Sequence, residues 1–420
     1  MKWQLDNFTD KDIVFVGRGQ GRSASGVETF LKKHAKVKSF QAVDKQTNDV
    51  PLDFLKQYDA SRTIFIKNEA IPGSEMPVPY ITTMQLFFEL QQQIGATTIG
   101  ITGTKGKSTT ASLTAHVLRA TGKDVYLAGN IGASPFTFLD TADKDSIFVL
   151  ELSSYQLSDL KRSPQISACI NLYNDHTDWH GSLKSYWEAK HNIMRFANEN
   201  DLFVYNPAFH ELVEWAKSAT CQTVAINPED SLDLSKAQLF GDHNRLNALV
   251  VRELVRPFHV TDQQFKDALV SFTPLRHRMQ FVATKSSRTY IDDAIGMTPE
   301  STLASMAAVQ EKYGPIGCLL LGGQDRNYDF GPLMTAVVAA KIPALVLFPN
   351  TANKMTDAMP SEYKPVILRA KTMLEAVQFA STQAPHGTVV LLSTAAPSYS
   401  IWKDFEEKGE QFHTAVANLP

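Results

Sequence analysis

Cysteine is scarce in this sequence, and long apolar runs are missing from it. The three cysteines, Cys169, Cys221 and Cys318, stand far apart, so none has the spacing of a metal site. Unpaired cysteines are typical of a reducing compartment, which predicts a cytoplasmic protein. No apolar run approaches the roughly 18 residues that a membrane-spanning helix needs, and the first residues lack the apolar core of a signal peptide. The sequence therefore predicts no membrane span.

An excess of either charge is also missing, since the net charge is −3. A balanced charge provides no bulk attraction to nucleic acid, so we expect no nucleic-acid partner. The hydrophobic fraction of 43% and the charged fraction of 20% are ordinary for a globular protein. A chain of 420 residues is too long for one core, and its length suggests about three domains.

The most informative segment covers residues 100–110 and reads Gly-Ile-Thr-Gly-Thr-Lys-Gly-Lys-Ser-Thr-Thr. It follows the strand-like run Thr97–Ile99 and precedes an amphipathic pattern that predicts a helix over 107–121. A strand, a glycine loop and a helix in this order form a phosphate-binding loop, because backbone N–H groups and the positive end of the helix face one anion.

Each residue type in this loop has a physical role. Gly103 and Gly106 permit the turn, Lys107 supplies a charge for the β/γ-phosphates, and Ser108 offers a hydroxyl to Mg²⁺. The match is to a variant of the common pattern, because Ile101 stands where that pattern has glycine. The loop indicates ATP or GTP without indicating the reaction. The alternative is a glycine-rich turn before an ordinary helix.

Strand-like runs alternate with helical patterns along almost the whole chain, which predicts an α/β fold with parallel sheets. The alternation divides into three expected domains, at residues 1–85, 86–274 and 275–420. We expect a Rossmann-like first domain, a central P-loop ATPase-type domain and a Rossmann-like last domain. A proline-containing turn near Pro274 sets the last boundary.

The first expected domain contains a broken dinucleotide-binding fingerprint. The run Ile13–Val16 predicts a buried strand, glycines alternate over residues 17–21, and a helix is predicted over 23–34. Asp44 follows the second strand, where the fingerprint has an acid. Arg22 stands in place of the last glycine, so a nucleotide-diphosphate site and a plain tight turn both remain open.

Three features of the middle domain are candidates for a site near the loop. Glu151 ends the apolar run Ile147–Leu150, which predicts a carboxylate at the carboxyl end of a central strand and a plausible Mg²⁺ ligand. The segment Asn174–Gly181 is dense in ionisable side chains and follows another strand. Lys190 lies in a predicted helix, where a single lysine is usually a solvated residue.

Further polar residues remain ambiguous from spacing alone. Asn244 and Asn247 share one face of a predicted helix and suit either a nucleoside or a helix cap. The segment Arg276–Arg278 suits a polyphosphate or a basic surface turn. Asp293 ends a predicted strand, where it suits a ribose or an ion pair with Arg278.

Together these motifs resemble the Mur ligase family, the ATP-dependent amide-forming enzymes of bacterial peptidoglycan synthesis. Within the family, the chain looks most like the ligases that add glutamate to UDP-N-acetylmuramoyl-L-alanine. The motifs that carry the resemblance occur in family order along the chain, at residues 102–108, 129–132, 151–157, 175–178, 243–247, 277–278, 320–323 and 405–412.

The resemblance implies a role for each matching position. It implies ATP binding by Gly103, Thr104, Gly106, Lys107, Ser108, Thr109, Asn244, Asn247, Arg278 and Asp293. It implies Mg²⁺ binding by Ser108, Glu151, His176 and Lys190, with Lys190 carbamylated, and a catalytic role for Lys107, His176 and Lys190. It implies contacts to the UDP-sugar or to the incoming glutamate by Gly19, Gln20, Asp44, Asn130, Ser153, Arg326, Ser398 and Phe405. The partners implied are therefore small molecules, and the chain is expected to be a monomer.

One segment departs from the family pattern. Where the family has Asn-Asp-Ser-Lys-Ala-Thr-Asn, this chain has Asp-Asp-Ala-Ile-Gly-Met-Thr over residues 292–298. Ile295 and Met297 thus replace two polar contacts to the amino acid, and a desolvated carboxylate needs such contacts. Arg326 is expected to compensate in part. The segment resembles a subgroup with members that use L-glutamate, so we expect D-glutamate and leave L-glutamate open.

Three alternative functions fit the sequence less well. A folylpolyglutamate-synthase-like ligase performs the same chemistry on a folate, but the run over residues 151–157 and the first domain argue against it. A non-catalytic nucleotide-binding regulator would not need Lys107, Glu151, His176 and Lys190 together. An amidation partner of the MurT type usually carries a four-cysteine zinc insert, which three scattered cysteines exclude.

Overall fold

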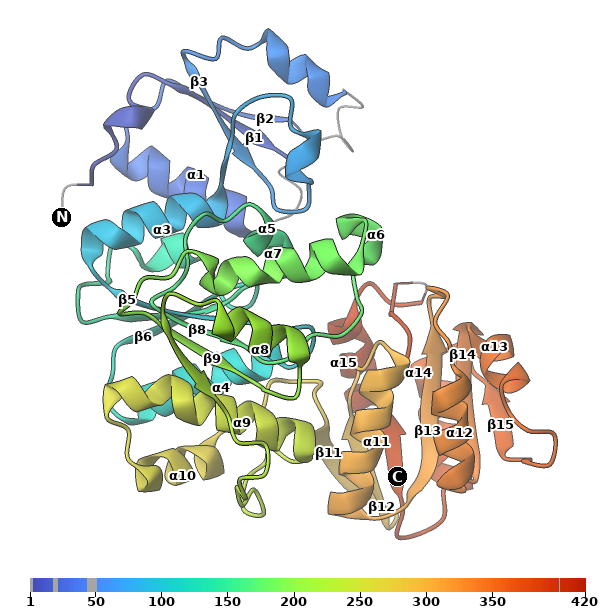
Figure 1. The fold of residues 1–420 in the computed structure, drawn as a ribbon. Helices are drawn as coiled ribbons and strands as arrows, with labels where there is room; N and C mark the ends of the chain where they lie inside the picture. The colour runs from blue at the N-terminus through green and yellow to red at the C-terminus, as the bar shows by residue number, and fades with distance from the viewer. Residues whose placement is uncertain (1–2, 18–21, 44–50, 400) are drawn as a thin grey trace. The chain divides into compact units, whose positions relative to one another are not determined.

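The computed structural model describes residues 3–17, 22–43, 51–399 and 401–420. Its contacts divide the chain into two compact units. Unit 1 comprises Met1–Asp233 and Leu246–Phe272, and unit 2 comprises Leu234–Arg245 and Thr273–Pro420. The predicted α/β fold is confirmed, since strands and helices alternate in both units (Figure 1). The division into three domains stays a prediction.

Unit 1 contains two sheets, and all of their paired strands run parallel. The first sheet has the order β2-β1-β3-β4, with β1 (Asp12–Val16), β2 (Ser39–Val43), β3 (Thr63–Lys67) and β4 (Ile81–Thr82). The second has the order β10-β9-β8-β5-β7-β6, with β5 (Thr97–Thr102), β6 (Val125–Gly129), β7 (Ile147–Glu151), β8 (Ile166–Cys169), β9 (Leu202–Tyr205) and β10 (Gln222–Ala225).

The helices of unit 1 cover these sheets. They are α1 (Arg22–His34), α3 (Thr83–Ile94), α4 (Lys107–Ala120), α5 (Ser154–Ser158), α6 (Thr177–His180), α7 (Leu183–Arg195), α8 (His210–Lys217) and α10 (Asp262–Ser271). A further helix, α9 (Asp242–Val255), contributes residues to both units. One apolar core runs through both sheets of unit 1. Phe30 of α1 contacts Phe136, which contacts Phe87 of α3, which contacts Phe148 of β7.

The order of the second sheet fixes where a ligand can bind. Strand β5 lies between β8 and β7, and the connections from β5 and from β8 leave in opposite directions along the sheet. In open α/β sheets, ligands bind outside the carboxyl ends of the strands at such a switch point. The loop that follows β5 is the predicted phosphate-binding loop, so the fold places it at the favoured position.

Unit 2 is built around a sheet of order β11-β12-β16-β13-β14-β15. Its strands are β11 (Gln280–Lys285), β12 (Arg288–Asp292), β13 (Ile316–Gly323), β14 (Ala344–Asn350), β15 (Val366–Arg369) and β16 (Val389–Leu392). Its helices are α11 (Pro299–Tyr313), α12 (Gly331–Ala339), α13 (Ala352–Asp357), α14 (Met373–Gln383) and α15 (Phe405–Ala417).

Both faces of the unit 2 sheet are covered. Leu319 and Leu321 of β13 pack on the face that α11 and α12 cover, and Leu320 packs on the face that α14 and α15 cover (Figure 1). Successive side chains of a strand point to opposite faces. The continuous apolar run of β13 follows from burial on both sides.

The structure differs from the sequence-based expectation at two sheet edges and at one inner strand. Strands β3 and β10 were not predicted, and neither was β11, which pairs antiparallel with β12 in an otherwise parallel sheet. Exposed, mostly polar residues in β10 and β11 hide the apolar pattern that marks a buried strand. All three cysteines are buried and unpaired. Within the described part of the chain, no helix has the length and apolar character needed to cross a membrane.

A buried carboxylate fixes the turn before β11 against the last helix. Asp292, at the end of β12, is fully buried, and its Oδ2 accepts hydrogen bonds from His277 Nδ1 at 2.6 Å and His413 Nε2 at 2.8 Å. Burial alone would raise the pKa of Asp292. The hydrogen bonds from the two imidazoles outweigh this effect, so the pKa lies below its usual value. The His277 ring packs directly on the backbone of α15 at Gly409, where an added Cβ would lie 2.0 Å from Nδ1.

This contact predicts that Gly409→Ala destabilises the protein by about 1–3 kcal/mol, because the new methyl group must displace a buried ring. The measurement is the midpoint and slope of denaturant unfolding, with tryptophan fluorescence as the probe. Thr414→Ala, at an exposed position of the same helix, is the matched control and should leave the midpoint unchanged. Equal stabilities of the two variants would contradict the packing described.

Candidate functional site

The loop between β5 and α4 turns through two glycines whose backbone conformations other residues rarely adopt. Gly103 has a φ of 151° and Gly106 a φ of 81°. A Cβ at Gly103 would lie 2.4 Å from the Ile170 side chain, and one at Gly106 would lie 2.8 Å from Asn247 Oδ1. Both the positive φ angles and the lack of room for a side chain therefore require glycine at these two positions. The loop leads directly into α4, a helix of 14 residues whose first N–H groups have no intrahelical acceptor.

Asn171, just after β8, holds this loop in shape. Its Oδ1 accepts hydrogen bonds from the backbone N–H groups of Thr104 at 2.8 Å and Lys105 at 2.9 Å, and its Nδ2 donates to the Lys105 carbonyl at 3.0 Å. Sequence reasoning missed this residue, because nothing local to Asn171 points to a partner 67 residues earlier in the chain.

The predicted phosphate-binding residues all lie in the loop or in the first turn of α4, namely Gly103, Thr104, Gly106, Lys107, Ser108 and Thr109. Lys107 Nζ donates to the Thr104 carbonyl at 3.0 Å. Thr104 Oγ1 accepts from the Tyr173 N–H at 2.9 Å and from the Tyr186 hydroxyl at 3.2 Å. The loop is thus closely supported, and the roles of its residues stay predictions.

Lys190, on α7, is buried against the loop, so the interpretation as a solvated helix residue is wrong. Its Nζ donates to the Gly103 carbonyl at 2.9 Å and lies 4.8 Å from the centre of the Tyr186 ring. Burial, together with the nearby charge of Lys107, lowers the pKa of Lys190 to about 7. A large fraction of a buried amine with this pKa is uncharged near neutral pH.

Glu151 lies on the strand beside the loop, because β7 pairs with β5 and Glu151 is the register partner of Ile101. The carboxylate is buried, and its Oε1 accepts from Asn130 Nδ2 at 2.8 Å. Its other oxygen, Oε2, is buried without a hydrogen-bond partner among the described residues. A buried oxygen without a partner is costly, and a carboxylate oxygen of this kind fits a divalent cation.

His176 lies in the polar segment after β8 and has a positive φ of 51°. Its Nδ1 lies 2.8 Å from the Tyr155 hydroxyl, and its backbone N–H donates to Asp175 Oδ1 at 3.0 Å. Burial lowers the pKa of His176, although the Asp175 carboxylate opposes this effect. A lowered pKa favours the uncharged imidazole, which is the form that can bind a metal.

Two of the residues of unit 1 that were predicted to contact the UDP-sugar form hydrogen bonds within the protein, and three lie outside the described residues. Asn130 holds Glu151, as described above. Ser153 caps α5 through a capping box with Gln156, so its hydroxyl already accepts the Gln156 N–H at 3.2 Å. Gly19, Gln20 and Asp44 lie outside the described residues.

Unit 2 contains the other predicted nucleotide-binding residues, apart from Asn247. Asp293 is buried and accepts from the hydroxyls of Ser305 at 2.6 Å and Ser393 at 2.8 Å. Burial raises the pKa of Asp293 to about 6, against the effect of these hydroxyls. Asn244 Nδ2 donates to the carbonyl of Phe240, just before α9, at 2.8 Å.

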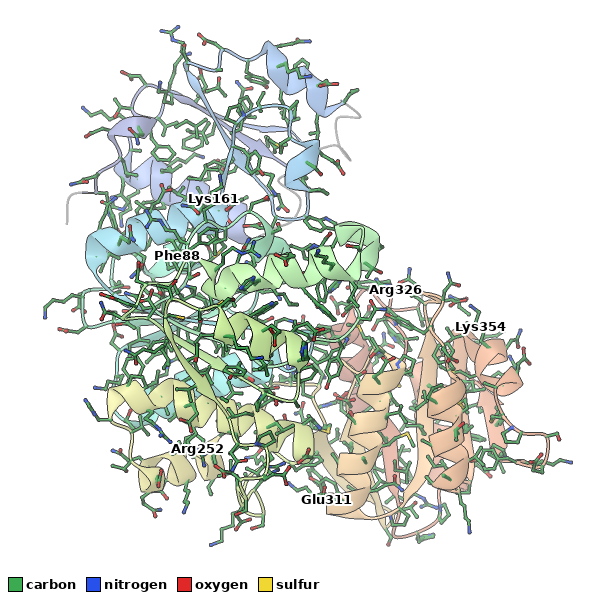
Figure 2. All side chains as sticks on the ribbon, viewed as in Figure 1. Phe88, Lys161, Arg252, Glu311, Arg326 and Lys354 are labelled. Carbon is green, nitrogen blue, oxygen red and sulfur yellow. The ribbon has the colours of Figure 1, made fainter. Side chains whose placement is uncertain are left out.

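The predicted amino-acid residues lie at or beyond the carboxyl ends of β13 and β16. Arg326 follows β13 and is exposed, while Ser398 follows β16 and is buried. Figure 2 labels Arg326. Phe405 begins α15, and its ring centre lies 6.3 Å from that of His277. Sequence reasoning missed Lys408 on the same helix, which is fully buried and donates to Thr394 Oγ1 at 2.5 Å.

Two family models match the chain. Residues 101–252 match the Mur ligase middle domain, and residues 277–396 match the Mur ligase glutamate ligase domain. The UDP-N-acetylmuramoylalanine–D-glutamate ligase of Halalkalibacterium halodurans is 30% identical over 362 residues, which cover 81% of this chain and 78% of the relative. The enzyme of the same name from Bacillus cereus strain ATCC 14579 is 30% identical over 397 residues, covering 88% of this chain and 86% of the relative.

Solved structures share the fold. The UDP-N-acetylmuramate-alanine ligase MurC from Thermotoga maritima superposes with a TM-score of 0.63 at 19% identity, covering 97% of this chain and 99% of that one. The MurF ligase from Thermotoga maritima in complex with ADP gives a TM-score of 0.65 at 16% identity, covering 98% and 96%.

The role of Asn171 predicts that Asn171→Ala loosens the loop without unfolding unit 1. The backbone N–H of Lys105 should then exchange with deuterium roughly tenfold faster or more, because it loses its acceptor. The Thr104 N–H should change less, because it also donates to the backbone carbonyl of residue 171 at 3.2 Å. Hydrogen–deuterium exchange with peptide-level mass spectrometry measures this. Asn174→Ala, at an exposed position of the same segment, should leave the exchange unchanged, and equal exchange in both variants would contradict the role.

Proposed function

This chain belongs to the Mur ligase family, and we propose that it joins glutamate to UDP-N-acetylmuramoyl-L-alanine with the cleavage of ATP. The product is a precursor of peptidoglycan. D-glutamate is the substrate named for the relatives, and we propose it for this chain, with L-glutamate as the alternative because Ile295 and Met297 replace polar family residues. The cytoplasmic location and the monomeric state also remain predictions.

The observation that carries the proposal is the position of Lys190. An unrelated nucleotide-binding protein has no need to bury a lysine against its phosphate loop, since burial of an ammonium group is costly. Here the Lys190 Nζ lies 2.9 Å from the Gly103 carbonyl, and burial leaves it with a pKa of about 7. The uncharged amine is the form that reacts with CO₂, so this environment supports the carbamylation that the family resemblance implies.

The chemistry proposed for the first step is transfer of the γ-phosphoryl group of ATP. A carboxylate oxygen of UDP-N-acetylmuramoyl-L-alanine attacks the γ-phosphorus, the bond to the β-phosphate oxygen breaks, and an acyl phosphate and ADP form. Backbone N–H groups of the loop and the Lys107 ammonium group stabilise the charge on the phosphoryl oxygens. Gly103, Thr104, Gly106, Ser108 and Thr109 would line the phosphates.

In the second step, the uncharged amine of glutamate attacks the acyl carbon. The tetrahedral species collapses, the phosphate leaves with the former carboxylate oxygen, and the amine loses its proton. Water would hydrolyse the acyl phosphate, so the reaction depends on its exclusion. Arg326, Ser398 and Phe405 are the residues that we propose to bind the glutamate, and Asn130 and Ser153 lie in the region proposed for the UDP-sugar.

Mg²⁺ is the proposed metal, and the residues present fit it. The buried Glu151 oxygen without a partner needs a cation or a donor, and carboxylate and hydroxyl oxygens suit this ion. Ser108, Glu151, His176 and the carbamate of Lys190 would hold it, and when bound it would neutralise phosphoryl charge. Asn244, Asn247, Arg278 and Asp293 remain the candidates for the nucleoside.

The proposal is tested by phosphate release with ATP, Mg²⁺ and UDP-N-acetylmuramoyl-L-alanine in the presence of D-glutamate or L-glutamate. We expect release that requires all components, and the more active enantiomer identifies the substrate. Release with a folate acceptor instead would favour the folylpolyglutamate-synthase-like alternative. ATP binding without release under any condition would favour a non-catalytic regulator.

Lys107→Ala should reduce turnover roughly 100-fold or more while leaving the melting temperature unchanged, because the loop loses its charge for the transferred group. Steady-state phosphate release measures the turnover. Lys123→Ala removes an exposed lysine just after α4 and should keep wild-type turnover. A Lys107→Ala enzyme of near wild-type rate would refute the role.

Lys190→Ala should likewise lose about 100-fold or more in activity, because the carbamate that supports the metal cannot form. Short carboxylic acids, which mimic the carbamate, should restore part of the activity. Lys184→Ala, at an exposed position of the same helix, is the control. The carbamate itself should appear as a carbon-13 NMR signal after addition of labelled bicarbonate, and its absence from the active wild-type enzyme would contradict the assignment.

A further inference from the structure

The two ring nitrogens of His176 have different surroundings. The Nδ1 atom lies 2.8 Å from the Tyr155 hydroxyl, within hydrogen-bond distance. The Nε2 atom lies 3.8 Å from Asp175 Oδ2, which is too far for a hydrogen bond. Because the two nitrogens of an imidazole point away from each other, a partner at Nδ1 leaves Nε2 as the nitrogen that can bind a ligand.

Tyr155 is held in place by two other aromatic side chains. The Trp179 ring meets it edge to face, with ring centres 4.8 Å apart, and the His180 ring stacks on it at 5.7 Å. Such aromatic pairs are stabilising. Trp179 is itself fixed, since its Nε1 donates to the Ala70 carbonyl at 2.8 Å. The Tyr155 hydroxyl is therefore presented to His176 from a ring with little room to move.

A second polar contact joins the same two helices. His180 Nε2 lies 3.0 Å from the Ser154 hydroxyl. Ser154 and Tyr155 belong to α5, while His176 directly precedes α6 and His180 ends it. Both short helices pack against α7, the helix that carries Lys190 (Figure 1). The position of the His176 ring is thus set by contacts among three helices.

One short segment of the sequence supplies both a candidate metal ligand and this tyrosine. Glu151 ends β7, and Tyr155 follows it by four positions. Ser153 begins α5 through its capping box with Gln156, so the turn from the strand into the helix is defined by local hydrogen bonds. The same turn that places the Glu151 carboxylate therefore also places the Tyr155 hydroxyl.

The direction of the hydrogen bond between Tyr155 and His176 determines which nitrogen can bind an ion. A neutral imidazole has a proton on one nitrogen and a lone pair on the other, and a tyrosine oxygen can accept a hydrogen bond. A histidine that binds a metal usually donates its other N–H to an acceptor, which fixes its tautomer and its orientation. If Nδ1–H donates to Tyr155, the lone pair is on Nε2.

We propose that Tyr155 is a positioning residue for the metal site, because its hydroxyl oxygen accepts the Nδ1–H of His176 and so presents Nε2 to the divalent cation. This assignment rests on the proposed function. Tyr155 acts through His176, and the packing of its ring makes the orientation of the imidazole a property of the fold before an ion binds.

The first test measures metal binding by the full-length enzyme. Tyr155→Phe removes the hydroxyl and keeps the ring. Mn²⁺ shares the oxygen-ligand preferences of Mg²⁺, and electron paramagnetic resonance measures its free concentration in a titration. Binding that is lost in His176→Gln belongs to this site. We expect the Kd of that site for Mn²⁺ to rise about tenfold or more in Tyr155→Phe.

Tyr58→Phe is the matched control, because it removes a tyrosine hydroxyl that is bonded to Gln41 Oε1 of β2 at 3.1 Å. It should keep the wild-type Kd for Mn²⁺. An equal rise in the Kd of both tyrosine variants would overturn the assignment, since the effect would then not depend on His176.

A second readout separates orientation from stability. With nitrogen-15 histidine and no metal, NMR shows which nitrogen carries the proton, and the signals missing from His176→Gln identify His176. We expect the proton on Nδ1 in the wild-type enzyme and a shift toward Nε2 in Tyr155→Phe, because free neutral histidine favours that form. A lower melting temperature of Tyr155→Phe with an unchanged tautomer would show a merely structural role and overturn the assignment.

The other outcomes are distinguishable. A wild-type enzyme with the His176 proton on Nε2, or an unchanged Kd for Mn²⁺ in Tyr155→Phe, would overturn the role of Tyr155 and leave the proposed function standing. A wild-type enzyme that binds Mn²⁺ no more tightly than His176→Gln would overturn the proposed metal site and this assignment with it.

Discussion

The site of unit 1 depends on one interaction, the burial of the Lys190 amine against the predicted phosphate-binding loop. A lysine without exposure to water is stable only where its surroundings accept its hydrogens or remove its charge. The Gly103 carbonyl accepts one hydrogen, and the nearby Lys107 disfavours the charge. The loop, α7 and the buried amine therefore constrain one another, and Glu151 on the adjacent strand adds a buried oxygen without a partner.

Unit 2 also contains buried polar groups, and some of them are paired while others are not. Asp292 is fully paired, because two imidazoles donate to one of its oxygens and the Ala294 N–H donates to the other at 2.8 Å. Ser398 and Gln324 are not paired among the described residues. A paired carboxylate fixes the fold, whereas buried polar atoms without a partner among the described residues require another explanation.

Local patterns in the sequence predicted the features that local physics determines. The strand, glycine loop and helix around Gly103 and Lys107 form one continuous segment, so their order alone indicated the site. Glu151 was found in the same way, because the apolar run of β7 places its last residue at the carboxyl end of the sheet. Alternating strands and helices likewise predicted the α/β fold.

Features that depend on distant partners could not be read from the sequence. Spacing alone placed Lys190 on a solvated helix face, and only the packing of α7 on the loop buries it. Asn171 contacts Thr104, which lies 67 positions earlier, and His413 contacts Asp292, which lies 121 positions earlier. The antiparallel strand β11 was missed because its exposed positions hide the strand pattern. The roles at Gly19, Gln20 and Asp44 stay predictions, as do the nucleoside contacts.

The central claim is that the chain forms an acyl phosphate from its carboxylate substrate and ATP. The most direct measurement uses UDP-N-acetylmuramoyl-L-alanine labelled with oxygen-18 in the alanine carboxylate, with mass spectrometry of the released phosphate. The account predicts one labelled oxygen in each phosphate, because the attacking oxygen leaves with the phosphoryl group in the second step. Phosphate that carries only unlabelled oxygen while the amide product forms would contradict it.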